Sequence, residues 1–355
     1  MKTKWLGLGQ TTIGLIAATA LLAACTGDDD APDTAATVPP SGPSATATAS
    51  RPAELTDVTL GYSPILIYSP IYVAIDKGYF ADEGINLKLE RISGGSDILT
   101  QTAAGNFQIG ASGLSAATFN AASAALKEHR DVPFEVVSPI HFERAPNNTP
   151  LVVSQARFAS GEITSIADLK GKKVAINAKG TGTEYALERA LQAGGLSVKD
   201  VSVQALSFND MGAALANKAI DGAMLAEPQA TLAKDGGFVT VLNDTYQTGD
   251  ASSTALYWNR EWARKNPDLA AGFLRAYLKA AKEMEAGWSD PATVDILTKY
   301  TKVPADVIAR ASRPHFDTSG RINTKFVTEL EGFFRSQDEL IYDGDLDLNA
   351  FIRKP

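Results

Sequence analysis

The 355-residue sequence contains one cysteine, Cys25, and only three histidines, His129, His141 and His315. A single cysteine excludes an intramolecular disulfide. The histidines are far apart and fit no HExxH spacing, so the sequence predicts no metal site. Lysine and arginine number 33 against 41 aspartates and glutamates. An acidic chain with no basic cluster argues against a nucleic-acid partner.

Signatures of catalysis and of nucleotide binding are also missing. The sequence GLSAA around Ser115 lacks the second glycine of a nucleophile elbow, and GTGTEY lacks the third glycine of a dinucleotide-binding loop. No GxxxxGK[ST] phosphate-binding loop occurs. The sequence therefore predicts no catalytic residue and no cofactor.

Residues 1–24 are typical of a bacterial lipoprotein signal. Lys2 and Lys4 precede an apolar run from Trp5 to Leu22, and the small-residue sequence LAAC ends at Cys25. This pattern predicts that Cys25 is lipidated, with palmitate, and holds the chain on the extracytoplasmic side of a membrane. A transmembrane anchor, or a secretory signal with a chance cysteine, is the alternative.

Residues 25–54 contain mainly Asp, Ala, Pro, Ser and Thr, with almost no large apolar side chain. Such a segment buries too little surface to offset its chain entropy, so it is predicted to be a disordered tether. No later apolar run reaches the roughly 20 residues that a membrane-spanning helix needs. The remaining 300 or so residues are enough for two domains of about 150 residues each.

A repeated unit organises this remainder. Residues Gly84–Ala111, GINLKLERISGGSDILTQTAAGNFQIGA, share their order of features with Gly195–Ala223, GLSVKDVSVQALSFNDMGAALANKAIDGA. Both read as glycine, alternating strand, helix opening at aspartate, then strand into Gly-Ala. The offset stays between 111 and 113 residues for the pairs Gly84 and Gly195, Asp97 and Asp210, and Gly110 and Gly222. A constant offset over a whole βαβ unit predicts two related lobes.

Strands and helices alternate through most of the chain, which predicts an α/β fold. The candidate strands are Val58–Tyr62, Asn86–Glu90, Gln108–Ala111, Phe134–Ser138, Leu151–Ser154, Lys173–Ile176, Val201–Ala205, Gly222–Leu225, Phe238–Leu242 and Thr254–Trp258. The later part of the chain is predicted to be mostly helical, because a proline or a capping residue stands near the start of each candidate helix. These candidates are Pro267–Ala286, Pro291–Tyr300, Pro304–Ala311 and Asn323–Gln337.

Further strands and helices both precede and follow the second copy of the repeat. If they belong to the first lobe, the chain crosses between the lobes twice, and this is the prediction. The prediction places residues 55–140 and 254–355 in lobe 1 and residues 150–245 in lobe 2. The crossings, 141–149 and 246–253, are polar and rich in turn-forming residues. Two crossings make a hinge. The alternative is that they are ordinary long loops in a single domain.

Helix starts that follow strands predict where a ligand binds. Candidate N-terminal residues are Ser69, Ser96, Ser112 with Ser115, and Thr181, the last forming a predicted capping box with Glu184. In a doubly wound sheet these helix N-termini border the ligand crevice, and their unpaired N–H groups can hold an anion without a fixed cation. Glycines at positions 94, 95, 113, 180 and 182 allow a close approach to the backbone. A small acid bound between the lobes is expected; the alternative is that these residues only cap helices.

Three further side chains are candidates for ligand contact. Glu227, in LAEP, follows the last strand of the second copy and could accept a hydrogen bond from a ligand; the alternative is a solvated carboxylate. Tyr68 lies in a loop and Phe142 in a predicted crossing, where aromatic walls would suit an organic ligand. A role in the core is the alternative for both.

The chain resembles a known family in a series of short motifs. IYSPIYVAIDKGYFADEGINLKL, GGSD, AAGNFQIGASG, DLKGKKVAI, GTGTEY and AEP occur in this order. The motifs cover about residues 57 to 290 and resemble the solute-binding proteins of ABC importers for nitrate, sulfonates and taurine. That group includes relatives that bind pyrimidine precursors of thiamine. The order and spacing of the motifs carry the resemblance.

The resemblance implies a two-lobed, type II periplasmic-binding-protein fold with a hinge and a ligand cleft between the lobes. It implies a monomer that closes on a small-molecule ligand and delivers it to an ABC permease and its ATPase. It places ligand contacts at Tyr68, Gly95, Ser96, Ser112, Gly113, Gly182, Thr183 and Glu227. The segment GYSPILIYS is bulky and apolar, which favours an organic ligand over an inorganic ion.

Two other functions remain open at this point. A lipid-anchored sensor would need the same closing cleft and would signal to a membrane partner instead of an importer. Pyrimidine-precursor synthases resemble this chain in fold, but they carry a cysteine-rich motif, and no cysteine follows Cys25 here. The sequence therefore favours a binding protein over an enzyme.

Overall fold

The computed structural model describes residues 54–92, 95–249 and 251–354. The predicted signal, the lipidation site Cys25 and the predicted tether up to residue 53 lie outside the described residues. Among the described helices, none has both the length and the apolar character that crossing a bilayer requires.

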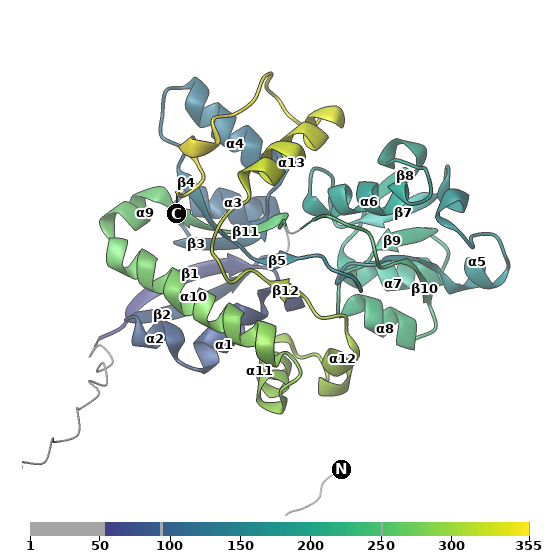
Figure 1. Ribbon diagram of the computed structural model, residues 1–355, viewed down its shortest axis with the longest axis horizontal. Coiled ribbons are helices and arrows are strands. Elements are labelled where there is room, and N and C mark those ends of the chain that lie inside the picture. The colour runs from purple at the N-terminus through teal and green to yellow at the C-terminus, as the bar shows by residue number, and fades with distance from the viewer. Residues whose placement is uncertain (1–53, 93–94, 250, 355) are drawn as a thin grey trace, which may run out of the picture. The chain divides into compact units, whose positions relative to one another are not determined.

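The first sheet has five strands in the order β2-β1-β3-β11-β4 (Figure 1). Strands β2, β1 and β3 are parallel, and β11 runs antiparallel to both β3 and β4. The bounds are β1 Thr56–Tyr62, β2 Ile85–Arg91, β3 Ile109–Gly113, β4 Phe134–Pro139 and β11 Thr254–Asn259. The alternate positions Val58, Leu60 and Tyr62 give β1 a buried face.

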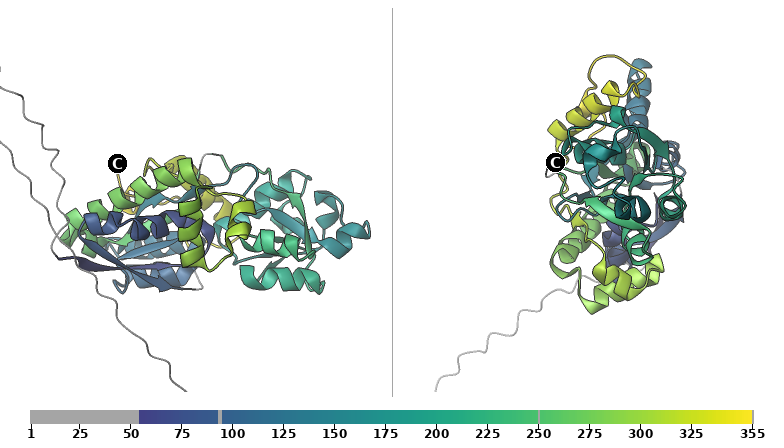
Figure 2. Two further views of the ribbon diagram at one scale, coloured as in Figure 1. Left: turned by 90° about the horizontal axis from the view of Figure 1, so that it is seen from below. Right: turned by 90° about the vertical axis from the view of Figure 1, so that its right-hand side faces the viewer.

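The second sheet repeats this topology in the order β8-β7-β9-β6-β10. Strands β8, β7 and β9 are parallel, and β6 is antiparallel to β9 and β10. The bounds are β6 Leu151–Ser154, β7 Lys173–Ile176, β8 Ser202–Ala205, β9 Gly222–Met224 and β10 Val239–Asn243. The strands of the two sheets lie in separate halves of the described part (Figure 1, Figure 2). The matching strand orders confirm the predicted repeat.

Each sheet has helices on both faces. In the first sheet one core joins β1 to α1 (Ser69–Asp76) and α10 (Pro267–Gly287), and the opposite core contains residues of α4 (Ala116–Lys127) and α13 (Thr324–Ser336). Helix α10 begins at a proline, and its buried residues Phe273, Tyr277, Ala280 and Met284 follow the helical period. The predicted α/β sheet with helices on both faces is confirmed.

The second sheet is covered in the same way. Residues of α6 (Gly182–Gln192) pack on one face, and residues of α7 (Phe208–Ala216) and α8 (Gln229–Asp235) pack on the other. The remaining helices are η1 Leu66–Tyr68, α2 Tyr79–Asp82, α3 Gly95–Ala103, α5 Gln155–Ala159, η2 Ile166–Leu169, η3 Val198–Asp200, α9 Arg260–Lys265, α11 Pro291–Thr301, α12 Ala305–Arg310 and η4 Leu348–Ala350.

The predicted elements agree closely with the observed ones. All ten predicted strands are present, and the four predicted C-terminal helices begin and end within one or two residues of α10, α11, α12 and α13. One pairing was not predicted: β5 (His141–Phe142) pairs antiparallel with β12 (His315–Phe316). Two-residue strands leave no periodic pattern in a sequence.

The chain passes from the first sheet to the second between β4 and β6, and returns between β10 and β11. These are the segments predicted as crossings. Each crossing therefore leads into β6 or β11, the strand that runs antiparallel to its neighbours. This strand is the fourth in the order of its sheet. The hinge role of the crossings stays a prediction.

Two buried tyrosines give a test of the core. The hydroxyl of Tyr277 is buried without a hydrogen-bond partner, whereas that of Tyr246 donates to the Thr149 carbonyl at 2.9 Å. A buried hydroxyl without a partner costs about 1–3 kcal/mol. We expect Tyr277→Phe to leave the free energy of unfolding unchanged or higher, and Tyr246→Phe to lower it by about 1 kcal/mol, as measured by urea denaturation. Equal losses in both variants would show that the Tyr277 hydroxyl is satisfied.

Candidate functional site

Helix α4 is the first helix after β3 in the first sheet, and helix α6 is the first helix after β7 in the second sheet. Ser115 is the N-cap of α4, and its backbone N–H donates to the Thr118 hydroxyl at 3.2 Å. Thr181 is the N-cap of α6. The predicted helix starts at Ser115 and Thr181 are confirmed.

The two helix starts contact each other. The Ala116 N–H donates to the Gly180 carbonyl at 2.9 Å, and the Leu114 N–H donates to the Ser253 carbonyl at 2.7 Å. A Cβ atom on Gly182 would lie only 2.3 Å from Ser253 Oγ, so this position admits only glycine without rearrangement. The end of β3, the start of α6 and the second crossing therefore form one junction, which we call the helix-start junction.

This junction brings together four of the residues predicted to bind ligand: Ser112, Gly113, Gly182 and Thr183. It also contains Ser253, which the sequence analysis did not identify. Ser253 lies in a predicted crossing and belongs to neither copy of the repeat, so no pattern marked it. The amides at the start of α4 were expected to hold a ligand acid, and here they hold protein carbonyls.

Ser112 and Tyr68 lie beside a buried tyrosine of β11. Ser112 is 2% exposed, and its hydroxyl has no hydrogen-bond partner among the described residues, although it is close to the phenol of Tyr257. Tyr257 donates to the Gly113 carbonyl at 2.6 Å. Burial raises the pKa of Tyr68, and the nearby Tyr257 raises it further. Both phenols therefore stay neutral and can act as donors. Sequence reasoning missed Tyr257 because it reads as an ordinary core residue of a strand.

Gly95 and Ser96 lie at the start of α3, after β2. The predicted cap at Ser96 is wrong, because α3 already begins at Gly95 and Ser96 is inside the first turn. The Ser96 side chain is exposed, and its carbonyl accepts from the Thr100 hydroxyl at 2.9 Å. Ser69 is likewise the first residue of α1 and not its cap, which is Tyr68. The ligand roles of these residues stay predictions.

The predicted capping box of Thr181 and Glu184 differs in its hydrogen bonds. Glu184 Oε2 accepts from the Gly180 N–H at 2.7 Å, one residue before the N-cap, and the Thr181 hydroxyl donates to the Ala178 carbonyl at 2.7 Å. Glu184 is 4% exposed. Its carboxylate thus fixes the loop that reaches Ala116, because it holds the N–H of the same residue whose carbonyl Ala116 binds.

A second carboxyl group, Glu339, lies against this loop. Asn120 of α4 holds the segment of Glu339 by donating to its carbonyl at 3.0 Å and accepting from the Ile341 N–H at 2.9 Å. Burial, and then the charge of Glu184, raise the pKa of Glu339 to about 7, while Lys179 acts in the opposite direction. Protonation of Glu339 removes the charge repulsion between its carboxyl group and that of Glu184. The two side chains therefore lie together most favourably when Glu339 is protonated.

Glu227 has protein partners on both carboxylate oxygens. Oε2 accepts from the Thr231 N–H at 3.0 Å, and Oε1 accepts from the Thr231 hydroxyl at 3.0 Å and the Ser312 N–H at 3.1 Å. Burial raises its pKa, against the lowering effect of these hydrogen bonds. The observed contacts fix the start of α8 to the segment after α12. The predicted contact of Glu227 with a ligand stays a prediction.

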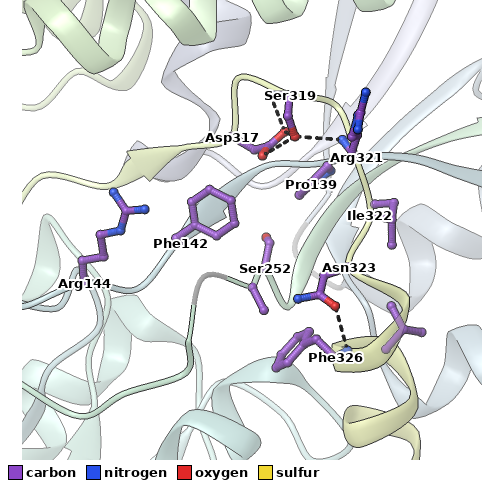
Figure 3. Close-up of a pocket in the computed structure, with 12 residues that line it drawn as sticks. Pro139, Phe142, Arg144, Ser252, Asp317, Ser319, Arg321, Ile322, Asn323 and Phe326 are labelled. Carbon is purple, nitrogen blue, oxygen red and sulfur yellow. Dashed lines mark hydrogen bonds between the residues drawn. The ribbon is translucent and has the colours of Figure 1, made fainter. Parts of the chain in front are cut away.

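Phe142 lies away from the helix-start junction, on the wall of a cavity of about 290 Å³ (Figure 3). Both crossings and the segment 317–327 form this cavity. Its lining residues are Pro139, Phe142, Arg144, Ala251, Ser252, Asp317, Ser319, Arg321, Ile322, Asn323, Phe326 and Val327. Ser112, Gly113, Gly182 and Thr183 are not among them. The structure therefore separates Phe142 from the other predicted ligand residues.

Helix α13 contacts elements of both sheets. Its Phe334 packs on Phe119 of α4 with ring centroids 6.0 Å apart. On the other side, the Tyr185 ring of α6 lies edge-on to Phe326 at 5.5 Å and to Phe333 at 5.4 Å. The Tyr185 hydroxyl also donates to Glu329 Oε1 at 2.6 Å. These contacts join α4 and α6 through a third helix.

Gly182→Ala tests the helix-start junction. The added Cβ clashes with Ser253, and overpacking of this kind costs about 1–3 kcal/mol of unfolding free energy. We expect a corresponding drop in thermal stability, which Ser253→Gly in the same chain should restore. Gly332→Ala is the control, because nothing lies within 4 Å of a Cβ there. A Gly182→Ala protein as stable as the wild type would contradict the close contact.

The raised pKa of Glu339 predicts a pH dependence. Because its pKa is above the ordinary value of 4.5, the stability it supports is full below that value and is lost as pH rises through about 7. We expect the melting temperature to fall between about pH 5 and pH 8, and less so in Glu339→Gln. Glu329→Gln, which removes a carboxylate of α13 instead, is the control and should keep the wild-type dependence. An unchanged slope in Glu339→Gln would exclude this carboxyl as the cause.

Comparison with known proteins agrees with the observed fold. Residues 67–287 match the family model described as NMT1/THI5 like. The riboflavin-binding protein RibY of Chloroflexus aurantiacus is 31% identical over 254 residues, which are 68% of this chain and 66% of that protein. The formylaminopyrimidine-binding protein of Halalkalibacterium halodurans is 25% identical over 235 residues, 65% of this chain and 66% of that protein. The chain thus spans just under two thirds of the length of both relatives.

Among solved structures, the alkanesulfonate-binding protein SsuA from Xanthomonas axonopodis pv. citri, bound to MOPS, aligns with a TM-score of 0.65. The identity is 18%, and the alignment covers 82% of this chain and 96% of that one. This likeness confirms the predicted type II periplasmic-binding-protein fold. The named relatives are binding proteins and not enzymes, in agreement with the sequence prediction. Because the family model covers most of the chain, the protein belongs to the NMT1/THI5-like family.

Proposed function

We propose that the protein is the extracytoplasmic solute-binding component of an ABC importer. It is anchored to the membrane by a lipid on Cys25, and it captures a small organic ligand, polar or anionic, by closure of two lobes. The observation that carries the proposal is the helix-start junction, in which helix starts that follow strands of two equivalent sheets face each other. The names of the relatives support it, since each is a binding protein.

The lobes of this proposal follow the two sheets. Lobe 1 consists of residues 55–140 and 254–355, lobe 2 consists of residues 150–245, and the crossings 141–149 and 246–253 form the hinge. Each lobe then contains one sheet with its own helices on both faces. The protein acts as a monomer, because one chain supplies both sides of the cleft.

The ligand site of the proposal lies at the helix-start junction. Ser112 contributes a buried hydroxyl near the Tyr257 phenol that accepts or donates no hydrogen bond within the described part of the chain, and the neutral phenol of Tyr68 adds an aromatic wall. Amide groups at the starts of α3 and α6, at Gly95, Ser96, Gly182 and Thr183, supply further donors, since the first amides of a helix lack intrahelical acceptors. Donors of this kind hold an acidic or carbonyl group without a fixed positive charge.

Closure in this proposal uses the hydrogen bonds of the junction. The Ala116 N–H donates to the Gly180 carbonyl across the two sheets, so separation of the lobes frees this amide for a ligand oxygen, on which the lobes then close. A micromolar ligand supplies about 8 kcal/mol of binding free energy. To shift a hinge equilibrium, the ligand needs to bind the closed state more tightly than the open state by only a few kcal/mol of that amount. The closed form then docks on the permease, which its ATPase drives.

The ligand is proposed to be organic. The riboflavin- and formylaminopyrimidine-binding relatives and the alkanesulfonate-binding structure all have organic ligands in their names. The segment between β1 and α1 agrees with this, because its residues Ile65 to Tyr68 are apolar or aromatic and mostly buried.

A thermal-shift screen of residues 55–355 tests the proposal. We expect one class among sulfonates, carboxylates, pyrimidines and flavins to raise the melting temperature. Ser112→Ala should then weaken binding of that ligand by about tenfold, the worth of one hydrogen bond, without loss of stability. Ser138→Ala is the matched control, because its hydroxyl is buried but already donates to the Pro139 carbonyl at 2.9 Å. It should lose stability and keep affinity. If no class stabilises the protein, solute capture is contradicted.

A further inference from the structure

A pair of carboxyl groups spans the contact between the two sheets at the helix-start junction. Glu184 belongs to α6, on the second sheet, and Glu339 lies in the segment after α13, on the first sheet. Figure 1 shows α13 beside α4, and α6 beside β7. Gly180 contacts both side chains: its N–H donates to Glu184 Oε2 at 2.7 Å, and a Cβ atom on it would lie 3.3 Å from Glu339 Oε2. The pair therefore joins the two proposed lobes.

Each carboxyl group is held by backbone and side-chain contacts of its own lobe. In lobe 1, Asn120 of α4 donates to the Glu339 carbonyl at 3.0 Å and accepts from the Ile341 N–H at 2.9 Å, so it fixes the segment on both sides of Leu340. In lobe 2, the buried Glu184 side chain is fixed by the Gly180 N–H. Because each group is positioned by its own lobe, the two meet only when the lobes are in contact.

One oxygen of this pair lacks a hydrogen-bond donor. Glu339 Oε2 is buried and has no donor among the described residues. A buried carboxylate oxygen without a donor is costly, whereas a protonated carboxyl group can itself donate to a neighbouring carboxylate. Burial and the charge of Glu184 raise the pKa of Glu339 to about 7; the Gly180 N–H acts against this rise, but it donates to Glu184. The contact between the lobes therefore favours one proton between the two groups.

The other charged groups near Glu339 do not take the place of this proton. Lys179, in the loop before α6, lowers the pKa of Glu339, but its side chain is exposed and the solvent screens it. Helix α4 presents the uncharged Asn120, and Asp338 on the same segment as Glu339 is exposed. Among the described residues, Glu184 is therefore the charged group with the largest effect on Glu339.

We propose that closure of the two lobes takes up one proton, which Glu339 and Glu184 share across the helix-start junction. This inference rests on the proposed lobe closure and adds a regulation of that closure by pH. When the lobes separate, the carboxyl groups part, Glu339 becomes solvated and its proton is released to water. The closed state is therefore favoured in mildly acidic surroundings, and capture of a solute weakens as the surroundings become neutral.

The pH range of this effect follows from the protonation of Glu339 in the two states. Below its ordinary pKa of 4.5 the carboxyl group is protonated in both states, and above about 7 it is ionised in both, so closure takes up no proton in either range. Between these values it is protonated in the closed state and ionised in the open state. Each pH unit in this range lowers the closing equilibrium constant by up to about tenfold.

Hydrogen–deuterium exchange on the full chain, purified in detergent and read at single residues by mass spectrometry, measures opening without any ligand. The reporter is the Ala116 N–H, which donates to the Gly180 carbonyl between the lobes. The reference is the Val136 N–H, which donates to the Phe351 carbonyl at 2.7 Å within lobe 1. We expect Ala116 to exchange faster than Val136, and its protection factor to fall about tenfold or more between about pH 5.5 and pH 7.5.

Three variants assign the pH dependence to this pair. Glu339→Gln mimics the protonated group, so its Ala116 protection should stay constant over the same pH range. Glu329→Gln, which removes a carboxylate of α13 outside the pair, should keep the wild-type fall. Glu184→Gln removes the charge that raises the pKa of Glu339, so the fall should move to lower pH. This third variant keeps the test decisive if Glu339→Gln does not fold.

Two results overturn the inference, and they differ in what they say about solute capture. If Ala116 exchanges faster than Val136 but with the same pH dependence in the wild type and in Glu339→Gln, the lobes open without this proton, and the proposed function stands. If Ala116 exchanges no faster than Val136 at any pH, the lobes do not separate, and the proposed closure fails as well.

Discussion

The hydrogen bond between the Ala116 N–H and the Gly180 carbonyl is the contact on which the arrangement of the site depends. It joins the first helix after β3 of the first sheet to the loop after β7 of the second sheet. The absence of a side chain at Gly182 allows Ser253 to pack against the start of α6 at the same point. Without this close packing of backbone on backbone, the two sheets would have no common surface at their strand ends.

The buried carboxyl groups near this contact belong to the scaffold. Glu184 holds the Gly180 N–H, and Glu227 holds the start of α8, each through backbone donors. Buried charges are costly unless such donors satisfy them. Apart from Glu339, whose pKa is raised to about 7, the groups left around the helix-start junction are hydroxyls, phenols and amides, which are neutral at any ordinary pH. A neutral set of donors suits reversible capture of a solute better than proton transfer, in agreement with the binding proteins among the relatives.

Local patterns in the sequence predicted the elements, and long-range contacts decided the rest. The strands were recognisable from short runs of β-branched residues between glycines, and the helix starts at Ser115 and Thr181 from their position after strands. Ser253, Tyr257 and Glu339 were not predicted, because each reaches the site from a segment distant in sequence. Glu184 shows the limit within a motif: its spacing from Thr181 fits a capping box, but its carboxylate binds Gly180. Side-chain partners depend on the loop conformation, which spacing does not fix.

Helix α13 restricts how the two sheets can move. Its aromatic residues pack on α4 through Phe334 and on α6 through Tyr185, so it is wedged between both. A rotation that pulled α6 straight away from α13 would expose three aromatic faces to water at once. The free-energy cost would be about 25 cal/mol for each square ångström exposed. Rolling of Tyr185 over Phe326 and Phe333 avoids most of that penalty. In the proposed lobe motion, helix α13 is therefore the pivot, and the direction of opening is set by which rings can slide past each other.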